Sequence, residues 1–311
     1  MAEPLESESS LLVVVLDVNA GAWAQSALPL DRALQQAVIF INAYLALNTE
    51  NRLVVLGTNA HECRYLYPAP GGGAPAHDVQ VYEQFRAVDA RLLSGAAAMV
   101  DGAASDGAGH SLVSRALSMA LCHIRRTLSS ATSKVWPRIL VLSAGSDSTR
   151  EYISLMNSIF AAQKMSVLID ACKVVGPDSV FLQQAADITG GNYVRLDAAG
   201  SESLLQTLMF TCLADHYTRG ILNAPGNELI DFRATCFCHK RVVDIGFVCS
   251  VCLSIFCQMA PVCSTCQTKF SFKIAGAGKG RPAAAPAAAT ASAPSAAGGT
   301  PSAAMSSLNL S

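Results

Sequence analysis

The stretch that decides the fold is Leu11–Asp17, which reads LLVVVLD. An unbroken run of Leu and Val suits a strand that is buried on both faces, as strands in the middle of a parallel sheet are, and Asp17 ends the run. The run is far too short to span a membrane, and residues 1–10 before it are acidic and polar, without the basic start of a signal peptide. We therefore expect a flexible N-terminus over residues 1–10 and a soluble, intracellular chain.

Apolar runs typical of strands alternate with amphipathic helical patterns from residue 11 to residue 215. This alternation predicts an α/β fold, with a doubly wound, mostly parallel sheet, helices on both faces and right-handed crossovers. We expect the domain to cover residues 11–217, and Ser111 to cap one of its helices. Further strands are predicted at 52–59, 64–68, 136–145, 166–175 and 192–197, and helices at 29–48, 80–99, 111–128, 149–165, 179–191 and 201–215.

The sequence contains no P-loop, no dinucleotide-binding G-x-G-x-x-G after a strand and no G-x-S-x-G nucleophile elbow. Cys122 and His123 are neighbours on a predicted helix, so they point to different faces and do not suit a nucleophile and its base. We interpret Cys63, Cys122, Cys172 and Cys212, which are scattered along the chain, as small buried hydrophobic residues. The sequence thus predicts a protein that is not an enzyme.

Polar residues at the end of the first strand could hold Mg²⁺, because Asp17 is followed by Asn19 and Gly21. The arrangement resembles the start of a von Willebrand factor A (vWA) domain, where D-x-S-x-S binds a metal. Relative to that motif, Asn19 and Gly21 replace the two serines, Ala144 replaces a supporting aspartate, and Ser111 stands for the threonine. One carboxylate makes a poor Mg²⁺ site. We expect a vWA-like fold without bound Mg²⁺, in which Asp17 serves as a loop or cap residue.

Seven of the eleven cysteines lie between residues 236 and 266. Thiols stay reduced inside cells, so a cluster this dense favours metal over disulfides. Two C-x2-C knuckles, separated by ten residues, can complete a tetrahedral site with four thiolates and no open position. The sequence predicts a structural zinc site formed by Cys249, Cys252, Cys263 and Cys266.

The remaining cysteines of this stretch and His239 offer a second zinc site. Its candidate ligands are Cys236, Cys238, His239 and Cys257. In a RING-like cross-brace, the partner expected three residues after Cys257 is Ala260, which cannot bind metal, and Cys238 could take its place. The alternative is that these thiols are buried beside the first site.

The boundaries of the C-terminal half follow from composition. Residues 218–231 read as a linker, and residues 232–272 as a small four-cysteine-type zinc-finger module. A module of this size has too little core to fold alone, so metal should supply most of its stability. Residues 273–311 consist mainly of Ala, Pro, Ser, Gly and Thr and are expected to be a disordered tail.

Several phrases of the sequence resemble one known family over about residues 11–272, namely the small vWA/zinc-finger subunits (subunit 3) of the transcription and DNA-repair factor TFIIH. The resemblance implies a non-catalytic core subunit whose vWA domain docks to the larger vWA/RING subunit, in a nuclear complex that also contains the helicases XPD and XPB. It implies roles in promoter opening for RNA polymerase II and in nucleotide excision repair, with no small-molecule substrate and no membrane contact. The phrases are NSIFAAQK (157–164), LIDAC (168–172), LQQAADITGGNY (182–193), DFRATCFCHK (231–240) and GFVCSVCLSIFC (246–257).

Three alternatives remain open at this point. A RING-type ubiquitin ligase would need two complete zinc sites, and Ala260 argues against them. A Mg²⁺-dependent vWA ligand-binding module would need a metal at Asp17. Direct DNA binding has weak support, because the net charge is −1 and the basic excess around the cysteines is small. The charged residues there are Arg233, Lys240, Arg241, Lys269 and Lys273, against Asp244.

Overall fold

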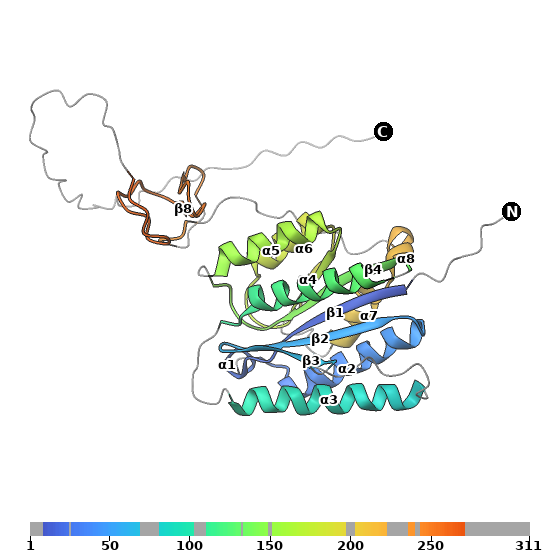
Figure 1. The fold of residues 1–311 in the computed structure, drawn as a ribbon. Helices are drawn as coiled ribbons and strands as arrows, with labels where there is room; N and C mark the ends of the chain where they lie inside the picture. The colour runs from blue at the N-terminus through green and yellow to red at the C-terminus, as the bar shows by residue number, and fades with distance from the viewer. Residues whose placement is uncertain are drawn as a thin grey trace, which may run out of the picture. The chain divides into compact units, whose positions relative to one another are not determined.

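The structure is a computed structural model of the 311-residue chain (Figure 1). It describes residues 9–24, 26–68, 81–102, 110–131, 133–148, 151–196, 203–222, 236–239 and 243–270. The expected tail at 273–311, residues 1–8 of the expected flexible N-terminus and most of the expected linker lie outside the described residues. No helix in this described part is long and apolar enough to cross a membrane.

A six-stranded sheet forms the centre of the N-terminal domain, in the order β3-β2-β1-β4-β5-β6. The LLVVVL run lies in β1, which pairs in parallel with β2 on one side and β4 on the other. Only the edge strand β3 is antiparallel, and every residue of β1 from Leu11 to Asp17 is buried. The predicted doubly wound, mostly parallel sheet is confirmed. The strands are β1 (Ser9–Asp17), β2 (Arg52–Thr58), β3 (Cys63–Tyr67), β4 (Val135–Ser143), β5 (Leu168–Lys173) and β6 (Tyr193–Arg195).

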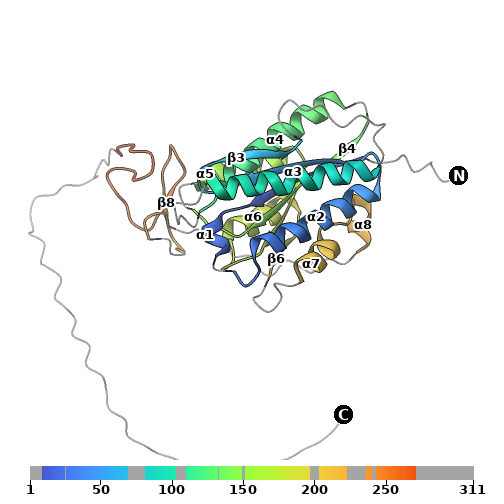
Figure 2. The same ribbon diagram turned by 90° about the horizontal axis from the view of Figure 1, so that it is seen from below.

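Helices cover both faces of the sheet because side chains of β1 alternate between two separate cores. Leu12, Val14 and Leu16 face one core, and the alternate residues Leu11 and Val13 face the other. Helices α2 (Leu30–Leu47), α3 (Val81–Gly102) and α7 (Leu204–Thr211) cover the first face. Helices α4 (Val113–Ser130), α5 (Tyr152–Lys164) and α6 (Val180–Thr189) cover the second. Figure 2 shows α2 and α3 side by side over the first face.

Helix ends agree with the sequence in one case and differ in another. Helix α6, predicted at 179–191, begins after Ser179, whose hydroxyl accepts from the Leu182 amide, and ends at Gly190 in the left-handed conformation. The prediction that Ser111 caps α4 is wrong. The Ser111 hydroxyl instead donates to Asp17, and the carboxylate of Glu151 accepts from the Ser114 amide in the first turn of α4.

Two short helices were not expected from the sequence, α1 (Ala20–Trp23) and α8 (His216–Ile221). Residues 218–221, which we expected to begin a linker, therefore belong to α8. This helix is tied to the sheet by Arg219, which makes two hydrogen bonds to the buried Asp170 of β5 and one to the carbonyl of Ala214. Arg138 of β4 donates to carbonyls in the turn just before α8, so two arginines hold this corner of the domain.

The cysteine-rich module contains little regular structure. Its two strands, β7 (Phe247–Val248) and β8 (Ile255–Phe256), form an antiparallel hairpin. Its buried hydrophobic cluster consists of Cys249, Phe256 and Cys263. Two of these three residues are predicted metal ligands, so the centre of the module is the candidate metal site itself.

Candidate metal centres

The two C-x2-C knuckles come together as the sequence predicts. The Sγ atoms of Cys249 and Cys266 lie 3.7 Å apart, and those of Cys252 and Cys263 lie 3.6 Å apart. All four ligand atoms lie within 4.8 Å of one another, and the cysteines are free thiols. The edge of a tetrahedron with Zn–S bonds of about 2.3 Å is about 3.8 Å. The spacing therefore fits a four-thiolate zinc site and is far too long for a disulfide.

The two knuckles have the same backbone geometry. In the first, the Leu253 amide donates to the Cys249 carbonyl at 2.9 Å, and Leu253 has a φ of 59°. In the second, the Gln267 amide donates to the Cys263 carbonyl at 2.9 Å, and Gln267 has a φ of 60°. The residue after the second cysteine thus turns the chain back in both knuckles. This positive φ is costly for residues other than glycine, and its repetition indicates that the site demands it.

A hydroxyl follows each knuckle two residues after its second cysteine. Ser254 Oγ lies 3.1 Å from Cys252 Sγ, and Thr268 Oγ1 lies 3.1 Å from Cys266 Sγ. Hydrogen bonds from the Thr268 side chain and backbone lower the pKa of Cys266 to about 6, whereas burial raises the pKa of Cys252 to about 11 despite its hydrogen bonds to Ser254. The pattern C-x2-C-x-[S/T] could have been read from the sequence, but our sequence analysis missed it.

The second group of predicted ligands also comes together. Cys238 Sγ lies 3.4 Å and His239 Nδ1 lies 3.3 Å from Cys257 Sγ, and all four ligand atoms, including Cys236 Sγ, lie within 4.8 Å of one another. Three ligands from one tight turn and one from beyond β8 thus form one cluster, while the two knuckles form the other. This interleaving has the connectivity of a cross-brace. Ala260 is not part of the cluster, and Cys238 supplies its fourth potential ligand atom.

At the carboxyl end of β1, Asp17 is buried and its carboxylate is fully occupied by protein donors. Oδ1 accepts from the Ser111 hydroxyl at 2.6 Å and from the Asn19 amide at 3.1 Å. Oδ2 accepts from the amides of Ala144 at 3.0 Å and Gly145 at 2.7 Å. Donors surround the oxygens that a cation would need, so these residues do not fit Mg²⁺. Asp17 thus links its own loop to the loop that contains Ser111 and the loop that contains Ala144 and Gly145. This is more than the predicted role of a loop or cap residue.

Lys173, at the end of β5, lies beneath the same loop. Its side chain is buried, and its ammonium donates to the carbonyls of Ala144 and Gly145. Burial lowers the pKa of Lys173, and the charges of Asp147 and Asp17 oppose that shift. The loop at residues 144–145 is thus fixed from both sides, by a carboxylate that binds its amides and an ammonium that binds its carbonyls.

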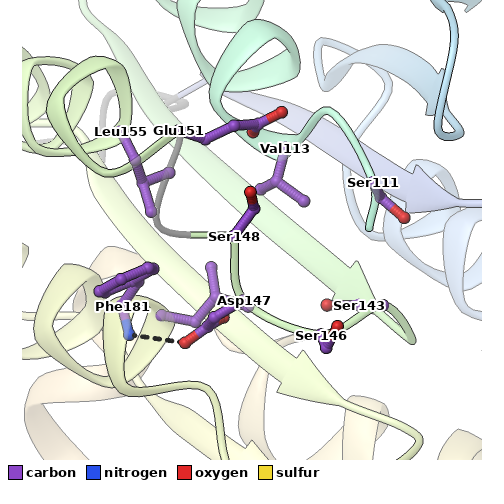
Figure 3. Close-up of a pocket in the computed structure, with 11 residues that line it drawn as sticks. Ser111, Val113, Ser143, Ser146, Asp147, Ser148, Glu151, Leu155 and Phe181 are labelled. Atoms are coloured by element: carbon purple, nitrogen blue, oxygen red, sulfur yellow. Dashed lines mark hydrogen bonds between the residues drawn. The ribbon is translucent and has the colours of Figure 1, made fainter. Parts of the chain in front are cut away.

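A small cavity of about 30 Å³ lies next to this loop (Figure 3). It has room for about one water molecule, whereas sites for small organic ligands are typically ten times larger or more. The two carboxylates in its wall serve as helix caps. Glu151 accepts from the Ser114 amide, and Asp147 accepts from the Ser179 hydroxyl and the Phe181 amide. Burial raises the pKa of Asp147, which its hydrogen bonds and Lys173 oppose.

The scattered cysteines meet the prediction only in part. Cys172 and Cys212 are buried, where burial raises the pKa of Cys212 to about 12, and Cys63 is half-buried. Cys122 is exposed, so the prediction that it is a buried hydrophobic residue is wrong. The half-buried His123 bonds to Arg126. Its pKa is lowered by burial and by the charge of Arg126.

Comparison with known proteins agrees with this geometry. The family model for transcription factor Tfb4 matches residues 9–267. The general transcription and DNA repair factor IIH subunit tfb4 of Schizosaccharomyces pombe is 41% identical over 279 residues, covering 87% of this chain and 92% of the relative. The corresponding TFB4 subunit of Arabidopsis thaliana is 38% identical, covering 84% of this chain and 89% of the relative.

Among solved structures, the crystal structure of the TFIIH p34 N-terminal domain superposes with a TM-score of 0.57 at 33% sequence identity. The superposition covers 65% of this chain and 96% of that domain. The chain therefore belongs to the Tfb4 transcription factor family, the family of small subunits of general transcription and DNA repair factor IIH.

Proposed function

We propose that this chain is a docking subunit of TFIIH in the nucleus, whose vWA-like domain binds the larger vWA/RING subunit. As a member of the Tfb4 family, the chain is a non-catalytic TFIIH subunit that takes part in transcription and DNA repair. The observation that carries the docking role is Asp17. In vWA domains this position takes part in metal-dependent ligand binding. Here four protein donors bind the Asp17 carboxylate instead, and these hydrogen bonds hold the loops at the carboxyl end of the sheet rigid.

Affinity purification from nuclear extract tests this proposal. The tagged chain is expected to recover the larger vWA/RING subunit together with the helicases XPD and XPB. Direct contact is then tested by co-expressing the vWA-like domain, residues 9–222, with the larger subunit alone. Recovery of the helicases without the larger subunit, or failure of the two purified proteins to form a complex, would contradict the proposed docking.

We further propose that both clusters in the cysteine-rich module hold structural zinc. The sulfur spacings support tetrahedral coordination in the four-cysteine cluster, and the soft thiolate and imidazole donors suit zinc in both. Four protein ligands leave no position for a reacting water, so the zinc would stabilise the module rather than take part in a reaction. The ligands proposed are Cys249, Cys252, Cys263 and Cys266 for one ion, and Cys236, Cys238, His239 and Cys257 for the other.

Metal analysis of the purified chain tests the two sites separately. The intact chain is expected to carry two zinc ions per molecule. His239→Ala should lose one ion and keep the four-cysteine site, because the two clusters share no ligand. A matched control is His110→Ala, since His110 is exposed, bonds to Ser146 and belongs to neither cluster. One zinc per molecule in the intact chain would restrict the proposal to the knuckle site.

A further inference from the structure

Four aromatic rings form a continuous chain from the vWA-like domain into the cysteine-rich module. Phe181 of α6 contacts Tyr152 of α5 with ring centroids 5.2 Å apart. Tyr152 meets Phe237 edge to face, with centroids 5.0 Å apart and an interplanar angle of 76°. Phe237 in turn lies 6.5 Å from Phe256. These separations lie within the range in which aromatic rings attract one another.

The position of Phe237 is set by the candidate metal site. It lies between the ligands Cys236 and Cys238, and its amide donates to the carbonyl of Ile255 in β8 at 2.8 Å. Its ring packs partly against the buried cluster of the module. A residue held between two ligands and one strand has little freedom, so metal binding fixes the direction in which the ring projects.

Tyr152 is equally well supported on the other side. It lies in the first turn of α5, next to Glu151, whose carboxylate binds the start of α4. One turn further along, Leu155 is buried against the sheet. Burial raises the pKa of Tyr152, as expected for a ring among apolar groups. By contrast, Phe160 on the same helix is 48% exposed and makes no ring contact within the described part of the chain.

We propose that Phe237 docks the cysteine-rich module onto this chain's own vWA-like domain, with Tyr152 and Phe181 as the receiving surface. Metal bound by Cys236, Cys238, His239 and Cys257 holds Phe237 in the docking position, a step that rests on the zinc proposed above. Because Phe181 also lines the cavity beside residues 144–148, the docking surface adjoins the carboxyl edge of the sheet. The second metal cluster thereby serves to orient the module, whereas the four-cysteine cluster holds its fold.

Hydrogen–deuterium exchange on the full-length chain tests the docking directly. Phe237→Ala should speed amide exchange around Tyr152–Leu155 by about fivefold, the factor expected for loss of one aromatic pair. Tyr152→Ala should reciprocally speed exchange at residues 236–239, although these lie outside its own domain. Phe160→Ala is the matched control and should change neither region. Tyr152→Phe keeps the ring and should behave as the unmodified chain.

A second experiment measures the rate at which a chelator removes metal from the same variants. Tyr152→Ala should release metal several-fold faster from the cluster that His239→Ala abolishes, and at an unchanged rate from the four-cysteine cluster. Unchanged exchange at α5 in Phe237→Ala would overturn the docking, and this variant does not depend on how Tyr152→Ala folds. A chain that carries no metal at the His239 cluster would refute the proposed second zinc, while the exchange measurement would still decide whether the module docks.

Discussion

The two folded parts of this chain are stabilised in different ways. The vWA-like domain has two cores, one on each face of its sheet, built from Leu, Val, Ile and Phe that are almost fully buried. The cysteine-rich module has one cluster of three buried hydrophobic residues, and two of them are candidate metal ligands. Burial of apolar surface is thus the main source of stability for the domain, whereas the proposed metal sites would supply most of the stability of the module.

Removing the metal should break this comparison most completely. Zinc bound to small modules supplies about 10 kcal/mol or more of folding free energy, so chelation or Cys249→Ser should unfold the module entirely. The domain should stay folded, because its two cores are separate from the cluster of the module, and only the exchange around Tyr152 should rise as Phe237 undocks. Metal content and amide exchange of the two parts provide the measurement. Cys122→Ser, an exposed thiol outside both clusters, is the control.

The opposite effect is expected for Gly191→Ala, which should destabilise the domain and leave the module unchanged. A Cβ at this position would lie 2.0 Å from the carbonyl oxygen of Ile169, so the backbone of β5 or β6 must shift. We expect a loss of about 4 kcal/mol in the free energy of unfolding of the domain, measured by chemical denaturation. Gly220→Ala is a good control, because a Cβ there meets nothing within 4 Å. A normal melting temperature for Gly191→Ala would contradict the packing described.

Breaking the Asp170–Arg219 pair should have the next largest effect. Arg219→Met leaves the buried carboxylate of Asp170 without its bidentate partner, which should cost about 3 kcal/mol. Exchange protection of α8 should fall with it. The exposed pair Arg195–Asp178 provides the matched control, and Arg195→Met should cost less than about 1 kcal/mol. Equal effects of the two substitutions would show that burial does not distinguish the pairs.

The smallest effect is expected at the N-cap of α8. Asp215→Ala removes the carboxylate that accepts from the Thr218 amide at 2.7 Å and should cost about 1 kcal/mol at pH 7. The same hydrogen bonds lower the pKa of Asp215. Its contribution is therefore present above the pKa of the unfolded chain and is lost as the pH falls through the lower folded pKa. Asp215→Asn should retain much of the cap without this pH dependence, as unfolding curves at several pH values would show.

Much of the domain could be predicted because its signals are local. The six-residue apolar run of β1 marks a doubly buried strand, and Ser179 and Gly190 mark the ends of α6. The two knuckles could also be predicted from the sequence, since a C-x2-C spacing places two thiols on one side of a turn. The short helix α8 has no comparable local signal in the sequence. Its six residues hold no buried side chain, and its place depends on Arg219 reaching Asp170 in a distant strand.

The sequence by itself determined that a parallel sheet is followed by a cysteine module with metal-ligand spacing, because apolar periodicity and ligand spacing act within a few residues. Only the tertiary structure decided how distant groups are shared. It brings the amides of Ala144 and Gly145 to Asp17, gathers Cys238 into one cluster with Cys236, His239 and Cys257, and sets Phe237 against Tyr152. Each of these arrangements joins residues that are far apart in the chain, or depends on which of several potential metal ligands lies close enough to the others. Such choices depend on three-dimensional distance, which residue types and local spacing do not encode.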